Sequence, residues 1–191
     1  MKVDFGKQTF LYPMPVLIIA TYDKDGVHDA MNAAWGGIFN TNQICICLDK
    51  SHKTVANLKQ SKAFTVSMAD VEHLVQCDYV GIVSANKVPD KLSKAGLKVS
   101  KSKFVNAPVL DDLKMVLECE LVSYDEKTEQ LVGNIINVAA DESVLTDGKI
   151  DPAKLKPITY DPVNHTYLQI GTVAGKAFDA GKALNKMTGK S

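Results

Sequence analysis

The stretch that decides the fold runs from Val16 to Trp35 and reads VLIIATYDKDGVHDAMNAAW. Its first seven residues, 16–22, are aliphatic, β-branched or aromatic, which is typical of a strand. The next four end in Asp25-Gly26, a preferred pair for the turn of a β-hairpin. The return segment ends in small residues beside Trp35, where the backbone can approach a flat ligand closely. The stretch predicts an antiparallel hairpin followed by a ligand-binding loop at 29–35.

Further short strands follow this hairpin along the chain. An alternating pattern at 116–124, a polar turn at 125–128 and a partner segment at 129–140 predict a second hairpin. Strands with only short helices between them favour a closed or nearly closed antiparallel barrel, a mainly β fold of the α+β class, over a doubly wound sheet. We expect a single domain over 1–191 with a C-terminal arm from about 172. The other expected elements are strands at 44–48, 63–68 and 166–171 and helices at 54–60, 70–83 and 87–96, the second helix burying Val71, Leu74, Val75 and Val80.

The charge balance excludes several classes of partner. The 22 basic side chains are all lysine, and 22 acidic side chains balance them. A neutral surface gives no general attraction to nucleic acid or to anionic membrane. Without arginine, any phosphate must be held by lysine, hydroxyl groups and backbone amides. The polar start of the chain and the lack of a long apolar run predict a cytoplasmic protein with no membrane association.

The cysteines and histidines do not predict a metal site. The four cysteines have no CxxC spacing, and we expect them to be reduced and packed in the core, including Cys45 and Cys47 on one side of a strand. His73 and Cys77 have helical spacing, but the other histidines fall on different elements. The chain also lacks GxGxxG, GxxxxGK[ST] and GxSxG, which disfavours the common nucleotide-binding and hydrolytic sites.

Three segments occur in an informative order: MNAAW at 31–35, DKSHKT at 49–54 and CDYVGIVSANKVPDK at 77–91. Together they resemble the flavin reductase-like family of FMN-binding split barrels, most closely its flavoredoxin-type branch. Members of that branch have an Asn-Ala turn near a tryptophan, a polar turn rich in Ser, Thr and basic residues, and a Cys-Gly-x-x-Ser-Gly-x-x-x-Asp-Lys-like stretch. The resemblance covers roughly 13–175.

The resemblance implies FMN as the cofactor and also implies where it binds. The ring would lie against backbone groups of Asn32, Ala33 and Ala34, with Trp35 packed on it or shielding it. The phosphate would lie where the polar turn meets a helix N-terminus, because free amides and the helix dipole favour an anion there. The remaining candidates for binding FMN are Lys50, Ser51, His52, Lys53, Thr54, Ser84, Ala85, Lys87 and Lys91.

The resemblance further implies an oxidoreductase that works as a homodimer. NAD(P)H or a redox protein would donate electrons, and a flavin, a metal complex or an electron carrier would accept them. Because the flavin carries the redox chemistry, no dedicated catalytic residue is expected. The alternative is a flavin-binding or electron-transfer module without fast NAD(P)H turnover. A pyridoxine-phosphate- or heme-directed relative is disfavoured, since arginine is absent and no axial histidine stands out.

Each candidate residue has a simpler reading. Trp35 could be a core aromatic residue, Asn32 a turn residue, the polar turn an ordinary helix cap, and Lys91 a surface lysine paired with Asp90. The family often has arginine in the polar turn and glycine where this chain has Ala85. If that position requires a positive φ, alanine would be strained there.

Overall fold

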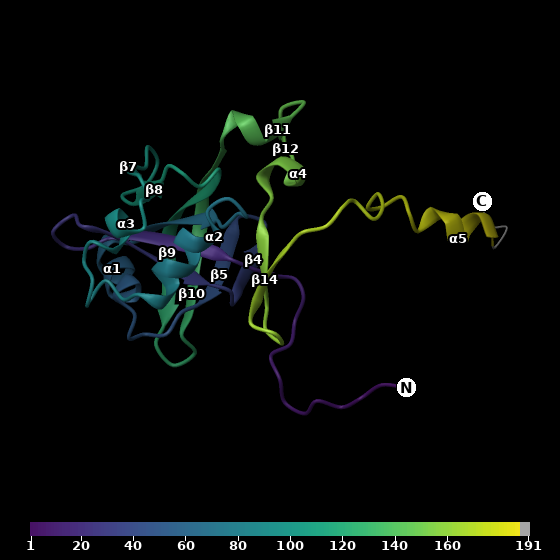
Figure 1. Cartoon of the computed structure of the whole chain (residues 1–191), viewed down its shortest axis with the longest axis horizontal. Coiled ribbons are helices and arrows are strands. Elements are labelled where there is room, and N and C mark those ends of the chain that lie inside the picture. The colour runs from purple at the N-terminus through teal and green to yellow at the C-terminus, as the bar shows by residue number, and fades with distance from the viewer. Residues whose placement is uncertain (188–191) are drawn as a thin grey trace.

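A seven-stranded antiparallel sheet forms the centre of the computed structural model, which describes residues 1–187 (Figure 1). Its two edge strands are joined in the chain by Ala34 and Trp35 alone. Seven flat strands about 4.8 Å apart would span about 29 Å, whereas three Cα steps reach at most about 11 Å. The sheet must therefore curl until its edges meet, at a junction that we call the seam. The order across the sheet is β3 (His28–Ala33), β2 (Leu17–Tyr22), β6 (Ala63–Met68), β9 (Met115–Asp125), β10 (Gln130–Ala140), β5 (Gln43–Cys47), β4 (Gly36–Asn40).

This curled sheet confirms the mainly β split barrel predicted from the sequence, including both hairpins. In the first hairpin Tyr22 pairs with His28, and the Asp23 amide donates to the Val27 carbonyl at 2.9 Å. In the second hairpin Asp125 pairs with Gln130. The interpretation of 29–35 as a loop was wrong, because β3 continues through Ala33.

The apolar run at 16–22 reflects burial on both faces of β2. Leu17 and Ile19 pack with Phe64 inside the barrel. Ile18 and Ala20 face the other way, into a second core. A strand buried on both faces is expected to be continuously apolar rather than alternating.

The helices are short, and their bounds are α1 (Lys53–Ser61), α2 (Leu74–Ile82) and α3 (Lys91–Lys94). α2 and α3 pack on the second, outer core with Ile18 and Ala20, whereas α1 contributes Val55 and Leu58 to the core inside the barrel. The prediction that α2 begins at Asp70 was wrong, since Asp70 instead forms a β-bridge with Pro157. The predicted stripe was also wrong in part: Val71 and Val75 are exposed, whereas Cys77 and Val80 are buried.

The prediction that all four cysteines lie in the core was wrong for two of them. Cys77 and Cys119 are buried, but Cys45 is half-buried and Cys47 is exposed. On β5 the isoleucines Ile44 and Ile46 point into the barrel, so the cysteines between and after them point outward. Isoleucine and cysteine are both apolar, and the sequence alone did not show which of them faces inward.

Small elements complete the described residues. A second sheet joins β1 (Met14–Pro15), β13 (Ile158–Asp161) and β14 (Thr166–Gln169). After β14 the chain leaves the body as an extended arm that carries α5 (Lys182–Met187) (Figure 1). No helix among the described residues is long and apolar enough to cross a membrane. The remaining elements are β7 (Val99–Lys101), β8 (Pro108–Leu110), η1 (Glu142–Val144), β11 (Leu145–Thr146), β12 (Lys149–Ile150) and α4 (Pro152–Leu155).

Candidate functional site

All three segments singled out in the sequence contribute to one small cavity of about 150 Å³ beside the seam. We call this cavity the amide pocket. It combines residues from β3, the start of α1, the end of α2 with the chain that follows it, and the first residue of α3. Its lining residues are Asp29, Met31, His52, Lys53, Thr54, Val80, Gly81, Ile82, Val83, Ser84, Ala85 and Lys91.

One wall of the amide pocket is the N-terminus of α1. His52 occupies the N-cap position, but its side chain makes no capping hydrogen bond. Within the described chain, the backbone N–H groups of Lys53 and Thr54 meet no acceptor. Free amides at a helix N-terminus, together with the helix dipole, favour an anion.

The facing wall is Ser84-Ala85, just beyond the end of α2. The N–H groups of Ser84 and Ala85 also meet no acceptor among the described residues, whereas the Val83 amide still bonds the Tyr79 carbonyl. Ala85 is buried and its φ is not positive, so alanine is not strained there. Residues with unbonded main-chain donors therefore line the cavity on two sides, and such donors are suited to phosphate oxygens.

Lys91 is not a surface lysine, and its expected partner Asp90 pairs with Lys94 instead. The Lys91 side chain is buried, and its Nζ lies 3.1 Å from Asp29 Oδ1. The same ammonium donates to the carbonyls of Val80 at 3.1 Å and Val83 at 2.9 Å. Two of its protons thus have carbonyl acceptors, and its charge is paired with Asp29 Oδ1, although that oxygen accepts no hydrogen bond.

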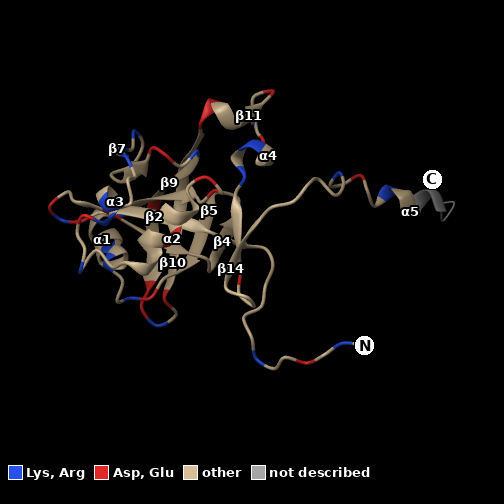
Figure 2. Ribbon diagram, viewed as in Figure 1, with Lys and Arg blue, Asp and Glu red and all other residues tan. Residues whose placement is uncertain are grey.

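The other basic and hydroxyl candidates divide into two groups. Lys53 lies at the pocket and pairs with Asp23, with 3.3 Å between Nζ and Oδ2. Lys50, Ser51 and Lys87 are exposed and are not among the residues that line the cavity. In Figure 2 basic and acidic segments alternate around the loops near α1 and α3, so the pocket does not lie in a broad field of one sign.

Asn32 is held by residues far along the chain. Its Nδ2 donates to the Cys77 carbonyl at 3.2 Å and lies 3.4 Å from the Tyr167 hydroxyl. Tyr167 in turn donates to Asp78 at 2.7 Å, and burial together with that carboxylate raises the pKa of the Tyr167 phenol. With the Asn32 side chain turned toward α2, its backbone is the part of this residue left for a ligand.

Helix α2 approaches β3 closely at Gly81. A Cβ atom at Gly81 would lie 2.8 Å from the Cβ of Asn32, closer than such atoms pack. β3 is also an edge strand, paired only with β2. Half of its backbone hydrogen-bonding groups therefore have no strand partner and can serve a bound molecule.

At the other end of the seam lies an apolar groove of about 320 Å³, which we call the tryptophan groove. Trp35 is half-exposed there rather than buried in a core, and its ring centre lies 6.3 Å from that of Tyr160. Ala34 is buried and lines the groove beside it, whereas Ala33 is half-buried and is not among the lining residues. The groove is lined by Leu11, Pro13, Met14, Pro15, Ala34, Trp35, Gly36, Gly37, Ile38, Cys45 and Cys47.

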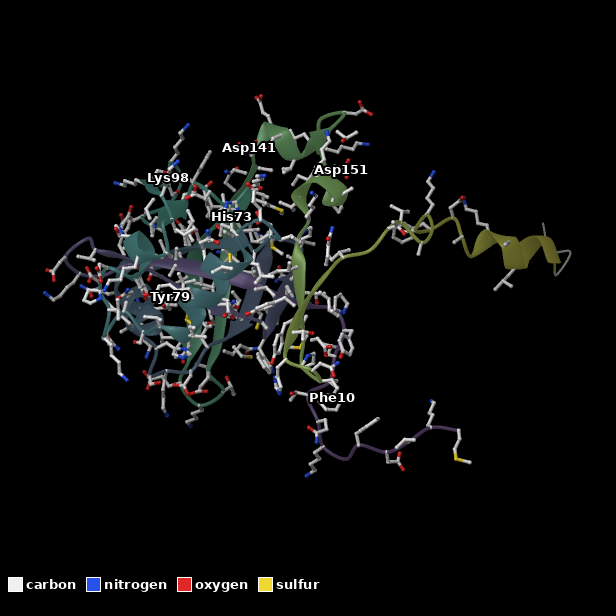
Figure 3. The ribbon with its side chains drawn as sticks, viewed as in Figure 1. Phe10, His73, Tyr79, Lys98, Asp141 and Asp151 are labelled. Carbon is white, nitrogen blue, oxygen red and sulfur yellow. The ribbon has the colours of Figure 1, made fainter. Side chains whose placement is uncertain are left out.

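Sequence reasoning missed four residues of this region: Asp29 as a site residue, Asp78, Tyr160 and Tyr167. Asp29 was within the quoted stretch, but nothing local indicated its partner. The tyrosines come from β13 and β14, and Leu11 and Pro13 come from the N-terminal segment that also carries Phe10 (Figure 3). The pairing of β1 with β13, and of β13 with β14, brings these distant parts of the chain together.

No metal centre is found in the part of the chain that the structure describes. His73 lies at the start of α2 (Figure 3), and its Nδ1 is 2.9 Å from Asp70 Oδ1. Burial raises the pKa of the Cys77 thiol to about 12, so that it stays protonated. These contacts tie the start of α2 to the body.

Comparison with known proteins agrees with this architecture. The model of the flavin reductase like domain matches residues 9–162. Flavoredoxin of Desulfovibrio vulgaris (Miyazaki F) is 35% identical and superposes with a TM-score of 0.91, over 95% of this chain and 100% of that one. Flavoredoxin from Methanosarcina acetivorans is 28% identical, with a TM-score of 0.87 over 96% and 99%. An FMN-binding domain of a flavin reductases-like enzyme from Shewanella baltica OS155 shares the fold, at 21% identity and a TM-score of 0.77 over 85% and 88%.

The chain therefore belongs to the flavin reductase-like family, and a role as a flavin-binding redox protein follows from that membership. Within the family it falls in the flavoredoxin branch, which confirms the resemblance seen in the sequence.

Proposed function

We propose that the chain binds FMN across the seam, with the phosphate in the amide pocket and the isoalloxazine ring toward the tryptophan groove. The observation that carries this proposal is the pair of unbonded amide walls, Lys53-Thr54 and Ser84-Ala85, around one cavity. Four main-chain donors replace the guanidinium forks that this arginine-free chain cannot supply.

The opposite end of the seam suits a flat aromatic ring. The exposed backbone edge of β3 offers donors and acceptors to a ring edge, and Trp35 with its small neighbours offers apolar contact to a ring face. When bound, FMN would supply the redox chemistry. The chain's own residues would bind the flavin, orient it and exclude water from one face.

We propose an oxidoreductase activity that passes electrons from NAD(P)H, or from a redox protein, through the flavin to a second flavin, a metal complex or an electron carrier. The similarity to two flavoredoxins supports a redox role without naming the donor. The alternative is a carrier that binds FMN but turns over NAD(P)H negligibly. Steady-state consumption of NADH and NADPH with FMN present distinguishes the two.

Flavin binding itself is tested by adding FMN to the purified full-length chain. The proposal expects a perturbed flavin absorbance spectrum and a saturable, stoichiometric titration. Riboflavin, which lacks the phosphate, should bind more weakly by about tenfold or more, because a charge-assisted hydrogen bond is worth roughly 1.5–3 kcal/mol. A chain that perturbs neither flavin would overturn the proposal.

We further propose that the protein is a homodimer. The arm after β14 exposes Val173 and Phe178 almost completely, and β4 presents Ile38 and Phe39 at an unpaired sheet edge. Exposed apolar arms and edges are typical of surfaces that a second chain covers. Light scattering should give about twice 20.8 kDa. A mass of one chain at tens of micromolar protein would contradict this proposal.

A further inference from the structure

The buried pair of Asp29 and Lys91 joins three parts of the amide pocket. Asp29 is 1% exposed and Lys91 3% exposed. One carboxylate oxygen of Asp29 faces the Lys91 ammonium at 3.1 Å, and the other accepts the Thr54 hydroxyl at 2.8 Å. The pair therefore connects β3 with the first turn of α1 and, through Lys91, with the end of α2.

Thr54 and Lys91 are both already engaged within the protein. A carboxylate only accepts hydrogen bonds, so the single proton of Thr54 is directed at Asp29. Lys91 donates hydrogen bonds to the carbonyls of Val80 and Val83, and its charge is paired with Asp29 Oδ1 at 3.1 Å, although that oxygen accepts no hydrogen bond. The Lys91 charge is therefore already balanced by a buried carboxylate before a phosphate enters the pocket.

The end of α2 leaves the Ser84 amide free, and Lys91 contacts that end. In a helix that continued past Ile82, the Ser84 N–H would donate to the Val80 carbonyl four residues earlier. Val83 instead has an extended backbone, with φ −113° and ψ 121°, so the helix stops and the Ser84 N–H is left without an acceptor in the described chain. The Lys91 ammonium donates to the carbonyls of Val80 and Val83 and so ties this helix end to Asp29.

We propose that Asp29 and Lys91 are a positioning pair: their charges neutralise each other, and their contacts hold the backbone N–H donors of the pocket in position. The phosphate is then held by main-chain amides rather than by the Lys91 ammonium. This inference rests on the proposed binding of FMN and names the groups that would recognise its phosphate. It reverses the expectation from the sequence that Lys91 contacts the cofactor directly.

A double-mutant cycle tests the pair, with Asp29→Asn, Lys91→Gln and the double variant compared with the wild-type protein. The measured quantity is the ratio of FMN affinity to riboflavin affinity, because a purely structural defect would weaken both flavins together. Lys91→Gln leaves the Asp29 charge without its counter-ion beside the phosphate, and the ratio should fall by at least about tenfold. In the double variant no unpaired charge remains, and the ratio should recover to within about threefold of the wild-type value.

If Lys91 bound the phosphate directly, the double variant would be as deficient as Lys91→Gln, and that result would overturn the proposal. If Lys91→Gln does not fold, the ratio of FMN affinity to riboflavin affinity is compared between the double variant and the wild-type protein alone. A ratio within about threefold of the wild-type value supports the proposal, and a ratio at least about tenfold lower overturns it. A double variant that does not fold also contradicts the proposal, because two charges that only balance each other can be removed together without leaving an unpaired charge. A wild-type protein that binds neither flavin would instead refute the proposed function.

Discussion

The amide pocket and the tryptophan groove lie at the two ends of the stretch 29–37 and differ in chemistry. The pocket is the smaller, about 150 Å³ against about 320 Å³, and it contains a buried ion pair and free backbone donors. The groove is lined by Trp35, prolines, glycines and two outward-facing thiols. One short stretch of chain, from β3 to the start of β4, thus presents a polar end and an apolar end, which match the two ends of a flavin mononucleotide. Substitutions at the polar end and at the apolar end should therefore affect flavin binding in different ways.

The largest effect is expected on stability, from removal of the Lys91 charge. Lys91→Met leaves the buried Asp29 carboxylate without its counter-ion and should lower the free energy of unfolding by roughly 3–5 kcal/mol. Lys94→Met, on the same helix, removes an exposed pair with Asp90 and should cost less than about 0.5 kcal/mol. Urea unfolding of both variants measures the difference. Equal losses of unfolding free energy in the two variants would show that Lys91 is not buried against Asp29.

At the apolar end, Trp35→Ala should weaken FMN and riboflavin by the same factor, on the order of 10- to 100-fold, because the lost contact is with the ring that both share. Trp35→Phe keeps an aromatic face and should lose much less. Because Trp35 is half-exposed, neither variant should unfold the protein. Flavin titration followed by absorbance gives the affinities, and a loss confined to FMN would place the phosphate, not the ring, beside Trp35.

At the polar end, Lys53→Gln should weaken FMN by about three- to tenfold and leave riboflavin unchanged. Lys53 lines the pocket, but its pairing with Asp23 already offsets part of its charge. Lys50→Gln is the matched control, since Lys50 is exposed and lies outside the lining, and should change FMN affinity less than about twofold. If the two variants were equally deficient, the phosphate would lie nearer the polar turn than the pocket.

The smallest effect is expected on the alkylation of the cysteine thiols. Cys47 is exposed and should react first, whereas burial raises the pKa of Cys77 and of Cys119 to about 12. With such a pKa only about one thiol in ten thousand is ionised at pH 8, so both should resist alkylation until the pH nears 12. Bound FMN should slow the reaction of Cys47, which mass mapping of the labelled cysteines would detect. If bound FMN left the alkylation rate of Cys47 unchanged, the isoalloxazine ring would not lie in the tryptophan groove.

The sequence predicted the local features of this fold and missed most of the long-range ones. The hairpin around Asp25-Gly26 and the helix after His52 follow from turn and capping preferences within a few residues. Lys91 carries no local sign that it is buried, because its acceptors lie on α2 and β3. Tyr160 and Tyr167 reach the site through the pairing of β1 with β13 and of β13 with β14.

The candidate site likewise contains residues with a local sequence pattern and residues whose position depends on the fold as a whole. Asn32 to Trp35 and His52 to Thr54 were found because small residues and a helix start have recognisable patterns. The outward direction of Cys45 and Cys47 was missed, since the curl of the sheet decides which face of β5 is buried.

The central claim, that a flavin lies across the seam with its ring near Trp35, is tested most directly by tryptophan fluorescence. Trp35 is the only tryptophan in the chain, so its emission reports on this one place. Titration of the full-length protein with FMN should quench that emission saturably at one flavin per chain, in parallel with the change in flavin absorbance. Emission that stays constant while FMN binds would place the ring elsewhere, and the absence of both changes would contradict flavin binding itself.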